Sequence, residues 1–568
     1  MSELVQDYRN IYVPDDQAIL DHLAPRSSVH YIPSIHAVVT YLHVFSFMAL
    51  VTLGVVFTHM GDSNFFKFTD PVVSGHTIEN RWELAVLCTI IGIDSFFARI
   101  SSEVVGEWKS LFVRDEEHRQ GGGKAKAIGL VVFDLGMYWV RTAMRAVFLY
   151  SQISFALAFA IGDMLAHYIV TNVKVSDYLR KEGTQPAGAS ADNFYRRHWS
   201  EPWMWVLVAL QVIGFGLLQL AFWLSGFFKS DYFEIGPPIS FFAIGMNHDL
   251  SYWIVVGYVF LDQLVASYAS ANINPWIFSY VYNNSRYKTD YDQSTVYMIF
   301  YINKVVSWLR SIVVLNLMME QVTFTAVFFL AELIYSVAHT WMVYDSGGRS
   351  PDGVILATIL RVIQGLSVIA FALSMQVWKP LKIVDAEGHK TEFGYFVPPP
   401  PFFMLGEMFD SGRIFWLFAL YAFFDRAVTT MAAEIISPYI AYVINGGDHH
   451  GMYYGRSMTK VIVWMDNIAR WVRTVFSTHF MLSSFYFSLV MMVADVATSA
   501  VVLDAYMQYK KRATHAVDLY HHMFGFDTDP DVVLDEYDDA KVRSYQKQIH
   551  YSRGAGRYAQ DDDKRKVS

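Results

Sequence analysis

The chain has 568 residues, of which 54% are hydrophobic, 16% are aromatic and only 17% are charged. Soluble globular proteins carry about 25% charged residues, so this composition excludes an ordinary set of soluble domains. The formal net charge of −9 weighs against a nucleic-acid partner, because phosphate binding requires basic patches. A single cysteine excludes both a disulfide framework and a thiolate metal cluster.

Several apolar segments are long enough to cross a membrane. Residues 35–57, 203–228 and 354–377 each reach the roughly 20 residues that span about 30 Å of hydrocarbon at 1.5 Å per residue. Residues 1–33 are polar and acidic, without the basic start and apolar centre of a cleavable signal, so we expect the first span to act as the insertion signal. The sequence therefore predicts an integral membrane protein whose surroundings are a lipid bilayer.

One polar pattern occurs three times along the chain. An aspartate inside an apolar run is followed by a Trp-x-Arg motif and then by a second acid. The three copies are Asp94, Trp139, Arg141, Asp163; Asp262, Trp308, Arg310, Glu332; and Asp425, Trp471, Arg473, Asp495. The spacing from aspartate to tryptophan is 45, 46 and 46 residues, and from tryptophan to the second acid it is 24 in every copy. Such regularity indicates internal repeats.

The repeats predict an all-α polytopic membrane protein of about twelve transmembrane helices, arranged as three tandem four-helix repeats. The expected boundaries are a polar N-terminal segment at 1–33, repeats at 34–180, 200–346 and 352–509, and a polar tail at 510–568. In each repeat a long loop rich in aromatic residues, Gly and Pro follows the first helix.

The third and fourth helices of a repeat leave an alternative open. Residues 293–346 and 457–511 contain no Gly or Pro, so the usual signal for a turn is missing. Each stretch forms either two short spans or one very long helix, and the second reading gives nine spans. An even number of spans keeps the repeats in one orientation, which favours twelve. Basic residues between the second and third helices and between repeats then predict that both termini are cytosolic, although the membrane is not identified.

The charged residues of the pattern need partners, because a charge in the bilayer costs about 2.5–3.5 kcal/mol on insertion scales. We expect Asp94, Asp262 and Asp425 to pair with the arginine of the same repeat, with the second acid completing a triad. In a structural interpretation, these charged groups form ion pairs that hold neighbouring helices together. A functional interpretation makes them a proton or ion relay, or a site on a pseudo-threefold axis. The structural one is favoured, because each repeat supplies both signs of charge.

Positions at which the repeats differ are candidates for an asymmetric pathway. Lys304 lies in the third helix of the middle repeat, and a buried lysine can form a Schiff base or move protons. Such a lysine is more often paired or extended to the interface. The pathway candidates are Glu103 and Glu434, which are equivalent and replaced by Ala271 in the middle repeat, and Asn303 with Lys304, where the other copies have Asp134 and Asp466.

A few residues resemble a known family. The run Ala469-Arg470-Trp471-Val472, the pair Leu42-His43 and the long loop after the first helix are similar to the first four helices of heliorhodopsins. Heliorhodopsins have seven helices and a retinal lysine in the last. Lys304 instead falls in the third helix of a repeat, so no retinal or other cofactor is expected.

No catalytic or metal motif is present. The sequence contains no phosphate loop, nucleophile elbow, His-Glu-x-x-His motif or paired cysteines, so we expect no enzymatic activity. One hypothesis is a structural or scaffolding component of a large membrane assembly, such as a virion or organelle membrane, that binds protein partners through its aromatic loops and both termini. The other is a channel or transporter with a pathway on the pseudo-threefold axis. Carriers usually break helices with Gly or Pro at midplane sites, which favours the scaffold.

Overall fold

The computed structural model is almost entirely helical. It describes residues 42, 45, 48, 63–114, 123–182, 201–241, 244–282, 293–345, 353–374, 381–384, 390–405, 407–444 and 456–523. The chain divides into two compact units, and every interaction discussed below lies in the larger one, which comprises Ile32–Ile277 and Tyr291–Val502. In the smaller unit the described residues are the ends of α10 and α16. The first predicted span lies outside the described residues, apart from positions 42, 45 and 48.

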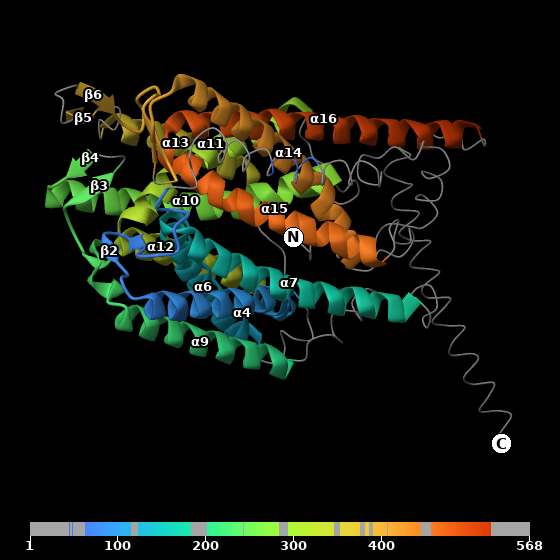
Figure 1. The fold of residues 1–568 in the computed structure, drawn as a ribbon. Helices are drawn as coiled ribbons and strands as arrows, with labels where there is room; N and C mark the ends of the chain where they lie inside the picture. Colours follow the sequence, from blue (N-terminus) through green and yellow to red (C-terminus); the bar gives the residue numbers. More distant parts are fainter. Residues whose placement is uncertain are drawn as a thin grey trace, which may run out of the picture. The chain divides into compact units, whose positions relative to one another are not determined.

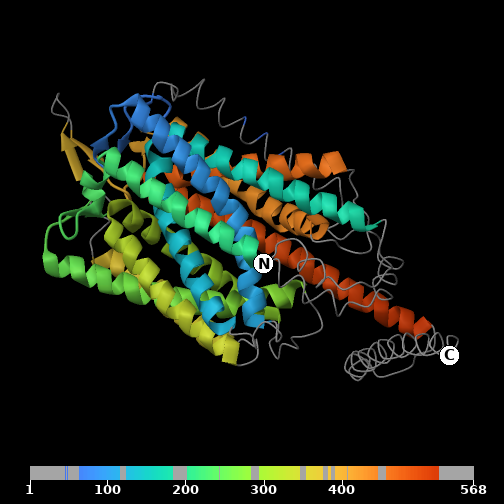
Figure 2. The same cartoon turned by 90° about the horizontal axis from the view of Figure 1, so that it is seen from below.

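Long helices lie side by side in the larger unit (Figures 1 and 2). The helices are α4 (Arg81–Arg114), α6 (Gly123–Ser151), α7 (Ile153–Glu182), α9 (Glu201–Leu224), α10 (Asp249–Tyr282), α11 (Gln293–Glu320), α12 (Val322–Asp345), α13 (Val354–Ser374), α14 (Gly412–Ile444), α15 (Arg456–Ser483) and α16 (Phe485–Met523). Backbone polar groups find no water in hydrocarbon, so apolar runs of this length must bond internally as helices.

Ten of these helices are long and apolar enough to cross a membrane, counting only the described residues. The eleventh, α15, carries Asp466, Arg470 and Arg473 and is too polar to be counted with them. The chain is therefore a multi-pass integral membrane protein. The number of twelve spans and the orientation of the termini stay predictions.

Short β-hairpins lie in the loops that follow the first helix of each predicted repeat. The strands are β1 (Val72–Val73) with β2 (His76–Thr77), β3 (Ile239–Phe241) with β4 (Ile244–Met246), β5 (Leu381–Val384) with β6 (Lys390–Phe393), and β7 (Phe402–Met404) with β8 (Glu407–Phe409). All four pairs are antiparallel. In the first hairpin Ser74 and Gly75 both have positive φ, as a two-residue turn requires. Figure 1 places the labelled strands β2 to β6 at one end of the helices.

The chain turns back sharply between the third and fourth helices. A single residue separates α6 from α7, α11 from α12 and α15 from α16. Phe148 and Phe155, on either side of the first turn, have ring centroids 4.7 Å apart, and Phe480 and Phe487 around the third are 5.0 Å apart. Helices that continued in line would hold such residues farther apart, so the chain bends back at the first and third of these breaks.

Hydrogen bonds to the loops that carry the β-hairpins hold the turn residues in place. Gln321 Nε2 donates to the carbonyl of Gly236 at 2.8 Å, and the buried hydroxyl of Tyr252 donates to Gln321 Oε1 at 3.0 Å. Gln152 Nε2 donates to the carbonyl of Thr69 at 3.1 Å. These hydrogen bonds stabilise turns that lack the Gly or Pro usually found there.

The third turn uses a tyrosine from the loop instead of a glutamine. The hydroxyl of Tyr395 donates to the carbonyl of Met481 at 2.6 Å, and the carbonyl of Tyr395 accepts from the amide of Phe485 at 2.9 Å. Burial raises the pKa of the Tyr395 hydroxyl above its usual value, so this group stays a neutral donor at physiological pH.

The buried side chains form three main clusters that do not follow the predicted repeat boundaries. One cluster contains residues of α4, α6, α7 and α9, the second of α10 to α13, and the third of α14 to α16. The first helices of the second and third repeats, α9 and α13, thus pack with the helices that precede them. Each cluster also receives one tryptophan from elsewhere: Trp471, Trp139 and Trp308 in that order.

We predict that Gln321→Leu lowers the free energy of unfolding by about 2 kcal/mol, because it leaves the Gly236 carbonyl and the buried Tyr252 hydroxyl without their partner. Unfolding of the purified protein in mixed micelles measures the change. Ser311→Ala is the matched control: the exposed Ser311 hydroxyl bonds only the Ser307 carbonyl of its own helix, so we expect a change within about 0.5 kcal/mol. Equal effects of the two substitutions would refute this role for Gln321.

Candidate functional site

The first acids of the pattern are paired with the arginines expected from the sequence. Arg141 on α6 holds Asp94 on α4 with two hydrogen bonds, from Nε to Oδ2 at 3.0 Å and from Nη2 to Oδ1 at 3.2 Å. Arg310 Nε on α11 donates to Asp262 Oδ2 on α10 at 2.7 Å.

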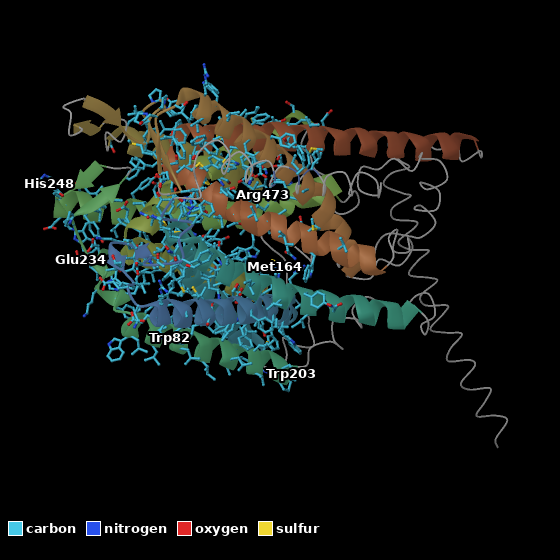
Figure 3. The ribbon with its side chains drawn as sticks, viewed as in Figure 1. Trp82, Met164, Trp203, Glu234, His248 and Arg473 are labelled. Atoms are coloured by element: carbon cyan, nitrogen blue, oxygen red, sulfur yellow. The ribbon has the colours of Figure 1, made fainter. Side chains whose placement is uncertain are left out.

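The third pair is looser. The Nε atom of Arg473 on α15 lies 3.8 Å from Oδ2 of Asp425 on α14. Figure 3 shows Arg473 among the side chains between the helices, whereas Glu234 and His248 lie at the end that carries the strands. All three ion pairs therefore connect the second helix of a predicted repeat to its third.

The second acids bond directly to tryptophans carried by helices of other predicted repeats. Trp139 Nε1 on α6 donates to Glu332 Oε2 on α12 at 2.7 Å, and Trp308 Nε1 on α11 donates to Asp495 Oδ2 on α16 at 2.9 Å. Trp471 Nε1 on α15 donates to Asp163 Oδ2 on α7 at 2.8 Å. We call each of these contacts an indole–carboxylate clasp. Within the described residues, the expected triad of aspartate, arginine and second acid is therefore replaced by a pair and a clasp.

The clasps form a closed series. Each tryptophan extends from a helix of one packing cluster into the next cluster and bonds to an acid there, and the third clasp returns to the first cluster. Two tryptophan rings are also stacked on the phenylalanine four residues before the acid. The ring centroids of Trp139 and Phe328 are 5.5 Å apart with an interplanar angle of 5°. Those of Trp471 and Phe159 are 6.3 Å apart with an interplanar angle of 11°. At the corresponding place in the remaining clasp the sequence has Met491, and Arg426 lies 4.8 Å from the ring of Trp308 instead.

The three clasp acids differ in the charges around them. Asp495 accepts from Lys304 Nζ at 3.2 Å, Arg426 Nη2 at 3.0 Å and Thr430 Oγ1 at 2.6 Å in addition to the tryptophan. Glu332 instead accepts from the neutral amide of Gln263, with Nε2 3.0 Å from Oε2. Asp495 is thus bound by two cations, whereas Glu332 is bound by a neutral amide.

The residue that follows the first aspartate accounts for much of this difference. The position is occupied by Ser95, Gln263 and Arg426 in the three copies. Ser95 donates to the Phe159 carbonyl at 2.9 Å and so turns to the backbone of α7. The middle and last copies instead point an amide or a guanidinium at the clasp acid. Comparing the copies at this position would have revealed the asymmetry.

The pathway candidates are placed as follows. Lys304 is bound to Asp495, and Asn303 accepts from Arg361 Nε at 3.0 Å while donating to Asn274 at 3.1 Å. The side chains of Glu103 and Glu434 lie outside the described residues. Their companions Asp134 and Asp466 form ion pairs with Lys109 at 2.7 Å and Arg470 at 2.8 Å.

Arg361 is a member of the network that the sequence pattern did not identify. It lies on α13, is 3% exposed, and donates to the neutral groups of Asn303, Ser270 and Gln364. Gln364 in turn donates to Asp262 Oδ1 at 2.7 Å. The signal was available, because the first helix of each repeat carries one polar residue in a Leu-polar-Val run: His43, Gln211 and Arg361.

No group of three metal-ligating side chains occurs among the residues that the structure describes. No protein-family model matches the chain, and neither the curated proteins nor the solved structures give a significant match. The resemblance to heliorhodopsins therefore rests on the residues that suggested it.

We predict that Arg310→Gln lowers the free energy of unfolding by about 3 kcal/mol, because Asp262 then remains in the helix bundle without its main cation. The double variant Asp262→Asn/Arg310→Gln is expected to recover at least half of that loss. Lys109→Gln is the control, since its pair with Asp134 is about one-third exposed and such pairs contribute less than about 1 kcal/mol. Equal losses in all three variants would contradict the pairing argument.

A second prediction concerns the clasps. Trp471→Phe is expected to destabilise the protein by about 1–2 kcal/mol, because the described hydrogen bond of Asp163 comes from this indole. Trp308→Phe should cost less, since Asp495 keeps three other donors. Trp416→Phe, at a position 70% exposed, controls for the loss of an indole. The ranking is measured by unfolding in mixed micelles, and the reverse order of the first two would overturn it.

Proposed function

We propose that this chain is a non-enzymatic structural protein of a membrane, in which three four-helix modules close around a pseudo-threefold axis. The observation that carries the proposal is the closed series of three indole–carboxylate clasps, from Trp139 to Glu332, from Trp308 to Asp495 and from Trp471 to Asp163. A ring of such contacts holds modules in a fixed arrangement. Rigidity of this kind suits a scaffold.

The pairing of the first acids supports the same proposal. Asp94 and Asp262 are 4% and 8% exposed, and each bonds to the arginine of its own repeat. Acids that line a conduction pathway would instead converge on a shared aqueous cavity. Local neutralisation leaves these groups a role in holding helices together.

Exposed apolar side chains on the loops provide surfaces for protein partners. Phe68 is 60% exposed, Ile235 73% and Met408 50%, and all three lie in segments that carry the β-hairpins. Apolar side chains that project from loops commonly mark contact sites. We propose that neighbouring proteins of a large assembly, such as a virion or organelle membrane, bind here and at the termini.

A channel or transporter is the second candidate, and one observation favours it. Asp495 is surrounded by Lys304 and Arg426, whereas Glu332 has neutral donors, so the three equivalent positions are not chemically equal. A pathway needs asymmetry of this kind at the site where a solute binds. The scaffold remains the better supported proposal, because four protein donors already bind the carboxylate of Asp495.

Flux measurements separate the two candidates. We expect proteoliposomes containing the wild-type protein to show no more leakage of protons, K⁺ or Cl⁻ than empty liposomes, and Asp262→Asn and Lys304→Met to change nothing. Cross-linking and mass spectrometry of the native membrane should recover the chain joined to other proteins through the residues of its loops. Flux that depends on Lys304, in the absence of such cross-links, would replace the scaffold by the transporter.

A further inference from the structure

Among the three clasp acids, Asp495 is bound directly by cations, whereas the described hydrogen bonds of Glu332 and Asp163 come from neutral donors. Asp495 is bound by Lys304 and Arg426. Arg145 lies beside the tryptophan that binds Asp163, with its guanidinium carbon 5.3 Å from the ring centre of Trp471. Glu332 accepts from the indole of Trp139 and the amide of Gln263.

Arg310, the cation near Glu332, is directed to Asp262. Arg310 Nε donates to Asp262, and Arg310 Nη2 donates to Gln263 Oε1, so the amide stands between the guanidinium and Glu332. Arg361 reaches Asp262 through Gln364. Of the groups facing Glu332, Arg310 on α11 is held by another carboxylate, and Tyr138 on α6 is a neutral phenol.

A carboxylate inside a membrane is costly to keep charged without a direct cation, so it binds a proton instead. Both described hydrogen bonds of Glu332 end on Oε2, which leaves Oε1 to carry that proton. We propose that Glu332 is a neutral carboxylic acid that exchanges a proton, and that it is a modification site for lipid-soluble carbodiimides. This inference is independent of whether the chain is a scaffold or a carrier.

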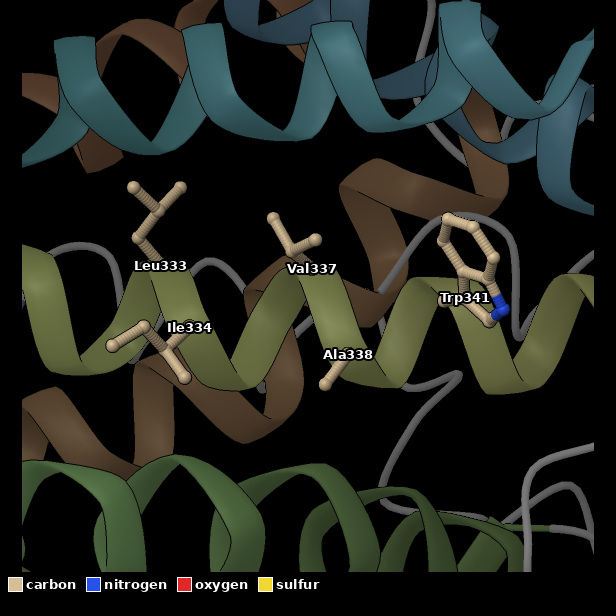
Figure 4. Close-up of a pocket in the computed structure, with 5 residues that line it drawn as sticks. All are labelled: Leu333, Ile334, Val337, Ala338 and Trp341. Carbon is tan, nitrogen blue, oxygen red and sulfur yellow. The ribbon is translucent and has the colours of Figure 1, made fainter.

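An apolar groove on the same helix starts at the residue next to the acid and offers a place for such a reagent to bind. The groove has a volume of about 390 Å³, begins at the residue after Glu332 and follows α12 (Figure 4). Its lining side chains are Leu333, Ile334, Val337, Ala338 and Trp341. A reagent dissolved in lipid therefore partitions next to the helix turn that carries the acid.

The chemistry selects for the protonated acid. Dicyclohexylcarbodiimide adds a carboxylic acid across one C=N bond: the carboxyl proton goes to nitrogen and the carboxyl oxygen bonds to the central carbon. The acyl group then moves from oxygen to nitrogen and gives a stable N-acylurea. The addition retains all atoms and needs no oxidant or reductant. A carboxylate held by cations has no proton to supply and reacts slowly.

The test is to label the full-length protein in membranes at neutral pH with dicyclohexylcarbodiimide and to map the adduct by mass spectrometry. We expect the adduct on Glu332 at a level at least about tenfold above that on Asp495 and Asp262. Labelling should fall as pH rises, and a membrane-impermeant carbodiimide should label Glu332 poorly. Equal labelling of the three acids, or no label on Glu332, would overturn the proposal.

Matched substitutions test whether the neighbouring donor controls the reaction. Gln263→Arg copies Arg426 of the last repeat and should suppress the label on Glu332. The converse pair, Lys304→Met/Arg426→Gln, removes both cations from Asp495 and should raise its label. Because the main comparison uses the unaltered protein, a variant that fails to fold does not weaken the test. A folded Gln263→Arg protein that labels like the wild type would refute the assignment.

Discussion

The structure depends on the neutralisation of charge inside a low-dielectric bundle. A carboxylate in lipid is tolerated only when a cation or several donors replace its water. Arg141 and Arg310 do this for Asp94 and Asp262. Such pairs add little net stability compared with apolar packing, because desolvation offsets much of the attraction. Their geometry instead selects one register between neighbouring helices, since any other register would leave a buried charge without its partner.

The clasps also supply donors to buried acids, but they connect clusters of helices across the larger unit and not only pairs of helices. An indole N–H is a neutral donor on a large apolar ring, so it enters a hydrophobic cluster and still reaches an acid. Trp139 packs in the cluster of α10 to α13 while bonding to Glu332. One side chain thus joins two helix packs by apolar burial and by hydrogen bonding together. The packs also share helices across the predicted repeat boundaries, as α9 shows by packing with α4, α6 and α7.

The sequence predicted the chemistry of the site better than its connections. The regular spacing identified Asp94, Arg141, Asp163 and their equivalents, and the need for neutralisation predicted the aspartate–arginine pairs. Spacing along the chain cannot tell which copy lies beside which, so the destination of each tryptophan was missed. The turns at Gln152 and Gln321 were unmarked because their stabilising bonds come from loops far away in the sequence. Arg361 was overlooked because its described acceptors are neutral side chains, two of which lie on other helices.

The closed order of the clasps bears on how the chain is made. Synthesis runs from the N-terminus, so α16 is made after the other described helices. Until it arrives, the indole of Trp308 lacks its acceptor, and until α15 arrives Asp163 lacks its indole. A chain that lacks α15 or α16 therefore leaves at least one clasp open. The series of clasps can therefore close only after α16 has been made.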